Sequence, residues 1–181
     1  MWKTVIIVVA VLIAGVLVVA ALRPDDFSVQ RSASIKAPAD KIYPMLVDFR
    51  QWPGWSPWEK LDPTMTRTLG GAASGPGATY AWSGSGKVGA GRMEITQSSA
   101  PSRIVIQLDF FRPFQARNIA EFTLEAQGEA AKVTWAMHGP ATLMSKLMGM
   151  LFNMDKLVGR DFEAGLAGLK CVAEDKASLP G

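Results

Sequence analysis

The sequence predicts an α+β fold in which a curved antiparallel sheet wraps around one long C-terminal helix, behind a single N-terminal transmembrane helix. Three observations predict it. An uninterrupted apolar run opens the chain at residues 5–22. Short segments of alternating apolar and polar residues follow one another from residue 64 to residue 139. A stripe of apolar residues at helical spacing then runs through residues 142–175.

The composition is that of one globular domain with a membrane segment, and it narrows the possible chemistry. The chain has 181 residues, of which 49% are hydrophobic and 19% are charged, and it can bury a substantial core. Its net charge of +3 comes without a run of basic residues, so we expect no nucleic-acid partner. A single cysteine, Cys171, and a single histidine, His138, favour neither a disulfide nor a metal site. No pattern indicates a cofactor.

The apolar run is long enough to cross a membrane. Residues 5–22 contain 18 consecutive side chains without charge or polarity, and a helix of that length spans roughly 27 Å. Lys3 precedes the run, whereas Asp25 and Asp26 follow it. This charge distribution favours a cytoplasmic N-terminus and a periplasmic or otherwise extracytoplasmic C-terminal domain. We therefore interpret residues 1–22 as a single-pass membrane anchor.

Two alternatives to the anchor remain open at the level of sequence. A cleaved signal peptide is one, because the small residues Ala20 and Ala21 suit a cleavage site, although the run is longer than the usual ~7–15 apolar residues. A core helix is the other, and it would need cover on every side. If the anchor is retained, residues 23–26 form a short linker that starts the domain (27–176) at the membrane surface, and 177–181 form a tail.

The first part of the domain reads as a strand, a helix and an interrupted segment. Residues 27–36 alternate as a strand whose inner face is apolar except for Arg31. Pro38 suits the first turn of the helix that follows. Residues 48–63 carry three tryptophans and two interrupting prolines, so we expect a loop or a broken short helix.

Six further strands are expected in the middle of the chain. Their short Gly- or Pro-containing connections predict an antiparallel meander. The alternation places Glu94, Asp109 and Glu121 on the outer face of the sheet, and a shift of one residue would turn Glu94 and Glu121 inward. The candidate strands are 65–69, 77–83, 88–97, 103–111, 115–126 and 131–138. Inward positions are Met93, Ile95, Ile106, Leu108, Phe110, Ala120, Phe122, Leu124, Val133, Trp135 and Met137.

The last element, 142–175, is predicted to be helical. Four glycines in it weaken a helix intrinsically, so we expect them to permit close packing on the sheet or to break the helix. A sheet wrapped around one helix leaves a cavity unless bulky side chains fill it. The apolar stripe consists of Met144, Leu147, Leu151, Met154, Val158, Phe162, Leu166, Leu169 and Ala173.

With this order of elements, residues 27–176 resemble the polyketide cyclase/dehydrase and lipid-transport superfamily, also called START-like, Bet v 1-like or SRPBCC. The resemblance is strongest to its membrane-anchored bacterial members. It implies a helix-grip fold with a hydrophobic cavity, but it does not imply one reaction. The stretches that carry it are Ser34–Pro38, Phe49–Trp58, Tyr80–Gly84, Gly89–Met93, Lys132–Trp135 and Asn153–Leu169.

Several apparent motifs favour ordinary structural roles. Residues 84–89 match G-x-G-x-x-G, but a strand rather than a helix follows them, so we expect a hairpin turn. His138 is expected at the surface or packed, because no second histidine supports it. Cys171 is expected to be a small packed residue.

Residues 143–154 form the least typical segment. They are rich in methionine and leucine, with Lys146 as the only charge. Methionine suits adaptable binding surfaces. We consider ordinary core packing, a gate over a cavity mouth, and a patch that touches the bilayer.

The leading functional hypothesis is a membrane-anchored domain that binds a hydrophobic small molecule or lipid in a cavity under the long helix. Alternatives are a cyclase- or dehydratase-like enzyme, for which no catalytic pair can be nominated, and a membrane-proximal interaction module acting through 143–154. Asn118 is the main polar side chain expected to face the cavity, where it could give one orienting hydrogen bond. The predicted ligand-binding residues are Trp58, Trp82, Met93, Phe110, Asn118, Phe122, Trp135, Met148 and Phe162.

Overall fold

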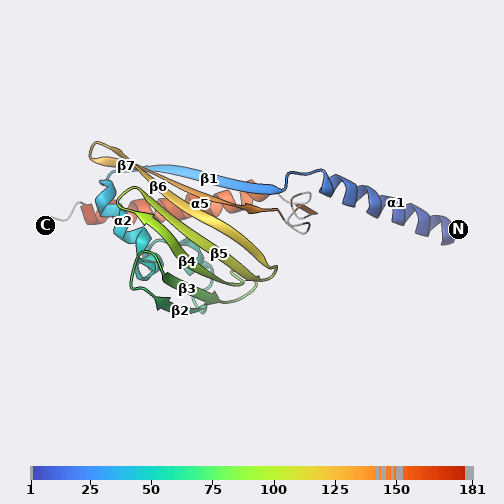
Figure 1. Cartoon of the computed structure of the whole chain (residues 1–181), viewed down its shortest axis with the longest axis horizontal. Coiled ribbons are helices and arrows are strands. Elements are labelled where there is room, and N and C mark those ends of the chain that lie inside the picture. The colour runs from blue at the N-terminus through green and yellow to red at the C-terminus, as the bar shows by residue number, and fades with distance from the viewer. Residues whose placement is uncertain (1, 142, 144–145, 148, 150–152, 178–181) are drawn as a thin grey trace.

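Seven antiparallel strands form one sheet in the order β1-β7-β6-β5-β4-β3-β2, with the long helix α5 lying against its inner face (Figure 1). The computed structural model describes residues 2–141, 143, 146–147, 149 and 153–177. The strands are β1 (Asp26–Ile35), β2 (Thr66–Gly71), β3 (Ala78–Ser83), β4 (Ala90–Ser99), β5 (Arg103–Arg112), β6 (Ala116–Gln127) and β7 (Ala130–Pro140). The helices are α1 (Trp2–Ala21), α2 (Ala39–Val47), the 3-10 helix η1 (Phe49–Gly54), α3 (Pro57–Leu61) and α5 (Met154–Ala177).

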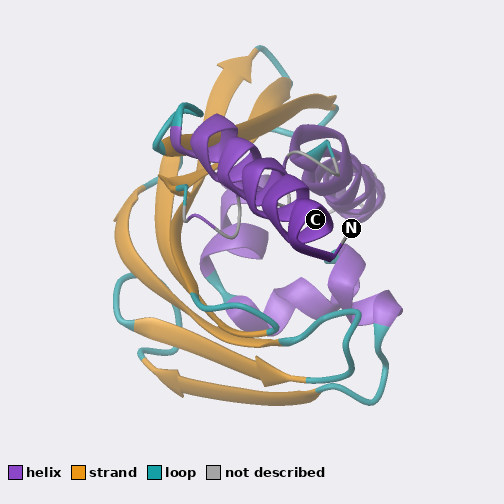
Figure 2. Cartoon of the chain, turned by 90° about the vertical axis from the view of Figure 1, so that its right-hand side faces the viewer, coloured by secondary structure: helices purple, strands orange, loops and turns teal. Residues whose placement is uncertain are grey.

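This arrangement confirms the predicted helix-grip fold. All six middle strands appear where alternation placed them, and consecutive strands pair as a meander from β2 to β7. The first strand, β1, closes the sheet by pairing with β7. Figure 2 shows the strands curving around the helices, which creates the concave inner face on which α5 lies.

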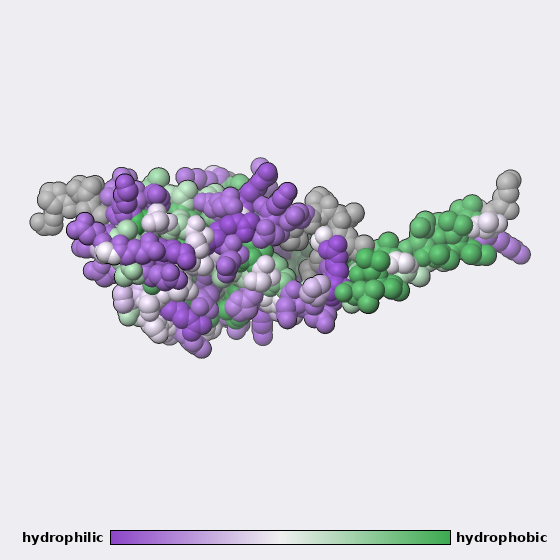
Figure 3. Space-filling model, turned by 90° about the horizontal axis from the view of Figure 1, so that it is seen from above, coloured by the Kyte–Doolittle hydropathy of each residue, from purple (hydrophilic) through white to green (hydrophobic). Residues whose placement is uncertain are grey.

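The helix α1 projects away from the domain as an apolar cylinder (Figure 3). It is long and apolar enough to span a membrane. Nearly all of its side chains are exposed, and Ala20 is the one that is buried. This exposure argues against the core-helix alternative, because a core helix would be covered by the rest of the protein.

The register of the sheet is the one that alternation predicted. Ile95, Ile106 and Phe122 are fully buried on the inner face. On the outer face, Glu94 pairs with Arg92 at 3.0 Å and Glu121 pairs with Arg103 at 2.8 Å. A slipped register would have brought these two glutamates inside, so the pairs show that they are not cavity residues.

Arg31, the one charge on the inner face of β1, joins that strand to α5. Its Nε lies 2.8 Å from Oε1 of Glu163, and its Nη1 lies 3.1 Å from Oδ1 of Asp155. The guanidinium crosses α5 at Gly159, where a Cβ atom would approach Arg31 Nη2 to 2.1 Å. The missing side chain at Gly159 therefore makes room for this ion-paired bridge.

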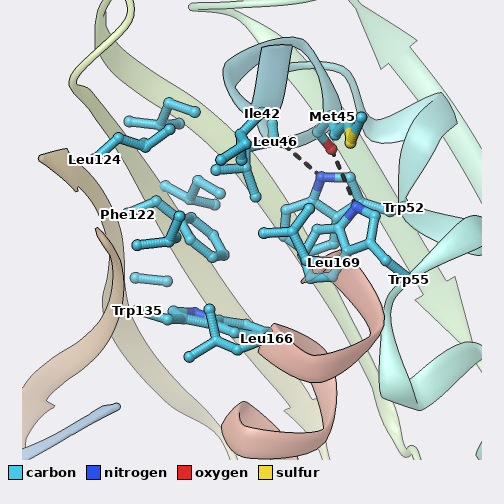
Figure 4. Packing of buried hydrophobic residues seen from close by; sticks show 14 of the residues in the cluster. Ile42, Met45, Leu46, Trp52, Trp55, Phe122, Leu124, Trp135, Leu166 and Leu169 are labelled. Carbon is cyan, nitrogen blue, oxygen red and sulfur yellow. Dashed lines mark hydrogen bonds between the residues drawn. The ribbon is translucent and has the colours of Figure 1, made fainter. Parts of the chain in front are cut away.

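The segment between α2 and α3 closes one end of the sheet with aromatic rings. Trp52 Nε1 donates to the carbonyl of Leu46 and Trp55 Nε1 donates to the carbonyl of Met45, both at 3.1 Å (Figure 4). Both indoles are buried, and these bonds satisfy their polar N–H groups. The expected broken helix is thus a packed cap made of η1 and α3.

The C-terminal helix differs from the predicted single helix 142–175. Asn153 is not helical, and its Oδ1 accepts a hydrogen bond from the backbone N–H of Lys156 at 3.0 Å. Asparagine in this position caps a helix N-terminus, so a new helix begins at Met154. The periodicity alone missed this boundary because apolar spacing continues across it. Half of the methionine-rich segment 143–154, including residues 144–145, 148 and 150–152, lies outside the described residues.

Two glycines let α5 approach its neighbours closely, as the sequence predicted. A Cβ atom at Gly165 would lie 2.7 Å from the ring of Trp135. At Gly168 it would lie 2.5 Å from the carbonyl oxygen of Trp55. The buried stripe of α5 between and beside them consists of Phe162, Leu166, Leu169 and Ala173.

Candidate functional site: an aromatic cavity under the long helix

A cavity of about 230 Å³ lies between the inner face of the sheet, α3 and the first half of α5. Small-molecule pockets are typically about 300–1,000 Å³, so this cavity suits a small ligand or one part of a larger one. Its wall is mostly apolar and aromatic. The lining residues are Trp52, Ser56, Trp58, Glu59, Met65, Tyr80, Trp82, Val88, Met93, Leu108, Phe110, Ala120, Trp135, Met137, Val158, Asp161 and Phe162.

The fold brings together most of the residues that the sequence nominated. Phe122 instead lies wholly in the core, with its ring centroid 4.8 Å from that of Trp135. Asn118 is buried beside Met137, with Nδ2 4.0 Å from Sδ, and it does not line the cavity. Met148 lies outside the described residues. The six nominated residues that line the cavity are Trp58, Trp82, Met93, Phe110, Trp135 and Phe162.

A continuous run of aromatic rings forms the wall nearest α5. Phe162 stacks on Trp135 with ring centroids 4.3 Å apart and planes at 5°. Trp58 meets the edge of Trp135 at 5.5 Å. On the opposite side, Trp82 contacts Phe110 at 5.8 Å in a T-shaped pair. Aromatic side chains provide a large apolar contact area at a small entropic cost, which suits them to ligand walls.

The Trp135 indole is unusual because its N–H has no acceptor. Its Nε1 is the one buried side-chain nitrogen or oxygen without a hydrogen-bond partner in the described part of the chain. An unsatisfied buried donor costs about 1–3 kcal/mol. The Trp82 indole, in contrast, donates to the carbonyl of Val88 at 3.0 Å.

Glu59, from α3, is a cavity carboxylate whose oxygens are already occupied. Tyr80 donates its hydroxyl to Oε1 at 2.7 Å, and Arg67 pairs with Oε2. Burial and the adjacent carboxylate raise the pKa of Tyr80 well above its ordinary value, so the phenol stays protonated and donates. The arginine neutralises the charge of Glu59 at the cavity edge.

Asp161, from α5, is the second cavity carboxylate. It is half-buried, and no residue within the described ranges forms a hydrogen bond or an ion pair with its side chain. Desolvation by burial raises the pKa of Asp161 above the ordinary aspartate value. The sequence did not single out Asp161 as a site residue. It lies one position before Phe162, at the edge of the apolar stripe, where a charged side chain usually faces solvent.

The glycine-rich segment 84–89 forms the β3–β4 hairpin turn, as expected, and carries Val88 on the cavity wall. Asp62 holds this turn, because its Oδ2 accepts from the backbone N–H of Ser85 at 2.7 Å. Its Oδ1 accepts from the hydroxyl of Thr64, also at 2.7 Å. These hydrogen bonds to the charged form lower the pKa of Asp62 to about 2.

The cavity lies at the end of the domain that faces α1. There β1 begins at Asp26, directly after the linker, and β7 ends opposite it at Pro140. The β5–β6 hairpin turn lies at this same end of the sheet, after cavity residue Phe110. Phe111, near the end of β5, and Phe114, in this turn, are about half exposed. Two half-exposed aromatic residues therefore lie at the end of the sheet where the linker joins β1.

Other candidate groups do not gather into a site. His138 is exposed, as expected. Cys171 was expected to be packed, but the structure shows it exposed, because the rotation of α5 buries Leu169 and Ala173 instead.

A separate hollow of about 200 Å³ borders β2 and η1. Its charged residues, Asp48 and Arg50, pair with each other at 2.8 Å.

Comparison with known proteins shows the family of this chain. A model of the family described as polyketide cyclase / dehydrase and lipid transport matches residues 26–174. The chain belongs to this family. Proteins of the polyketide cyclase/dehydrase and lipid-transport family bind hydrophobic small molecules or lipids, in agreement with an apolar cavity. No curated protein matches the chain significantly.

Solved structures agree with this assignment at the level of fold. Protein Ms6760 from Mycobacterium smegmatis is 19% identical, with a TM-score of 0.58 over 82% of this chain and 92% of its own. CV1439 from Chromobacterium violaceum is 13% identical, with a TM-score of 0.58 over 84% and 99%. The di-domain ARO/CYC StfQ from the steffimycin biosynthetic pathway is 10% identical, with a TM-score of 0.61 over 85% and 52%.

Proposed function

We propose that this chain is a membrane-anchored binding protein that holds a hydrophobic small molecule or lipid in the cavity under α5. The observation that carries the proposal is the apolar, aromatic-lined cavity of about 230 Å³. Binding would be driven by removing apolar surface from water, at about 25 cal/mol per Å². Family membership supports this class of ligand.

The position of the cavity supports a role at the membrane. Only residues 22–25 separate α1 from β1, so an anchored α1 would hold the domain at the bilayer surface. Arg23 donates to the carbonyl of Gly149, and Lys146 pairs with Asp25, so the linker is tied to the segment before α5. A ligand could then pass between the bilayer and the cavity without crossing bulk water. The domain is proposed to be extracytoplasmic, from the charges that flank α1.

Filling the cavity tests the proposal. Ala120 is buried on the cavity floor, so Ala120→Leu should occupy ligand space, whereas Ala126 on the same strand is exposed. Full-length protein in nanodiscs would be titrated with an environment-sensitive apolar fluorophore. We expect Ala120→Leu to weaken binding at least about tenfold and Ala126→Leu to leave it unchanged. Equal affinity of all three proteins would overturn the proposal.

One observation favours a cyclase-like enzyme as the second candidate. Two carboxylates, Glu59 and Asp161, line the same cavity, and a raised pKa of the kind found at Asp161 suits proton transfer. Glu59 is committed to Arg67 and Tyr80, so Asp161 would act as the general base. Conversion of a bound ligand by wild-type protein but not by Asp161→Asn would support this activity. Unchanged ligand mass after prolonged incubation with wild type would contradict it.

A further inference from the structure

Asp161 stands apart from the other carboxylates of the domain. Every other buried or half-buried aspartate or glutamate within the described ranges has a hydrogen-bond or ion-pair partner. The partnered set consists of Asp48, Glu59, Asp62, Glu94, Asp109, Glu121 and Glu174. A half-buried carboxylate without a partner loses hydration and gains nothing in return, so its environment favours a positive charge or a strong donor.

The rest of the cavity wall points to the same kind of ligand. None of the lining residues that the structure describes is lysine, arginine or histidine, so these residues offer an anionic head group no positive partner. Asp161 shares the cavity wall with Phe162, which stacks on Trp135, and Trp58 meets Trp135 in turn. Aromatic faces attract cations, most strongly where water is excluded.

We propose that Asp161 is the specificity-determining residue of the cavity and that it selects a hydrophobic ligand carrying a protonated amine. This inference rests on the proposed binding function and adds the chemical class of the ligand. The apolar part of the ligand lies against the aromatic wall, and the ammonium group donates a charge-assisted hydrogen bond to the Asp161 carboxylate. Anionic amphiphiles are disfavoured because the carboxylate repels them.

Three probes of equal chain length separate charge from hydrophobicity. Octylamine, octanol and octanoate would be titrated by calorimetry into the full-length protein in zwitterionic nanodiscs, with empty nanodiscs subtracted. The variants are Asp161→Asn and, as a matched control, Asp40→Asn, which changes an exposed aspartate on α2. The ammonium of octylamine can form a charge-assisted hydrogen bond with the Asp161 carboxylate, whereas the carboxylate of octanoate is repelled by it. Wild type and Asp40→Asn should therefore bind octylamine at least about tenfold more tightly than octanoate.

Asp161→Asn should lose this preference while binding octanol as wild type does, which also shows that the variant is folded. The inference would be overturned if octanoate bound wild type as tightly as octylamine, or if Asp161→Asn kept the preference. Octanol binding without any preference for the amine would reject the role of Asp161 and leave the proposed binding function standing. Failure of wild type to bind any of the three probes would reject both.

Discussion

At the scale of single residues, the two aspartates beside the cavity titrate in opposite directions. Asp62 accepts hydrogen bonds as an anion, which lowers its pKa to about 2, whereas desolvation raises the pKa of Asp161. Nothing in the sequence itself distinguishes these two aspartates. Their difference arises from whether the fold supplies donors, and only the tertiary structure determines that.

The raised pKa of Asp161 means that the native state binds more protons than the unfolded state between the two pKa values. Native stability should therefore fall as pH rises through the raised pKa. Asp161→Asn removes this penalty, so at pH 7 its apparent melting temperature should exceed that of wild type. The gap should close below the unfolded pKa of about 3.9. A pH-independent difference between the two melting curves would contradict this.

The lowered pKa of Asp62 has the opposite consequence. Its hydrogen bonds to Ser85 and Thr64 stabilise the native state above about pH 3.9, and that contribution is lost as pH falls toward 2. Asp62→Ala should lower the melting temperature at pH 7 and have little effect near pH 2. The Asp40→Asn variant, altered at an exposed site on α2, serves as the control. Equal destabilisation at both pH values would count against the assigned role of Asp62.

At the scale of elements, close packing decides the effect of a glycine substitution in α5. In an exposed helix position, Gly→Ala stabilises by up to about 1 kcal/mol. At Gly168 the new Cβ would lie 2.5 Å from the Trp55 carbonyl oxygen, so Gly168→Ala should destabilise by about 1–3 kcal/mol. Chemical denaturation measures this. Gly54→Ala, with no atom within 4 Å, is the control, and a stabilised Gly168→Ala would refute the packing.

The β5–β6 turn should contact lipid if α1 is anchored. A photoreactive phenylalanine analogue placed at Phe114 should crosslink to lipid in nanodiscs holding the full-length protein. The same analogue at Glu129, exposed in the β6–β7 turn at the opposite end of the sheet, should not. Mass spectrometry of the crosslinked products distinguishes the two sites. Equal lipid crosslinking at both positions would contradict the proposed orientation of the domain.

Elements whose periodicity is set by one buried face were predictable from the sequence. The strands follow because each places alternate residues against one core, as Ile95, Ile106 and Phe122 do. The start of α5 was not predictable from spacing, because the break depends on the local cap at Asn153. The cavity carboxylates were missed because they come from helices, whose rotation against the sheet is fixed by tertiary packing.

At the scale of the whole molecule, the cavity lies toward the end of the sheet where the linker joins β1. Its partly exposed lining residues come from several elements, for example Trp58 from α3, Val88 from the β3–β4 turn and Asp161 from α5. Of the six nominated residues that line it, four lie on the alternating strands β3, β4, β5 and β7 and one lies on the apolar stripe of α5, all elements whose inner faces were predictable. The sixth, Trp58, comes from α3. Phe122 and Asn118 also point inward, but other side chains cover them, and alternation cannot distinguish a covered position from an open one.

Native mass spectrometry of the full-length chain, released gently from its own membranes, tests the central claim most directly. We expect wild type to carry an additional hydrophobic small molecule or lipid and Ala120→Leu to carry much less of it, with Ala126→Leu resembling wild type. Wild-type protein free of any bound mass, or the same bound mass retained by Ala120→Leu, would contradict ligand binding in this cavity.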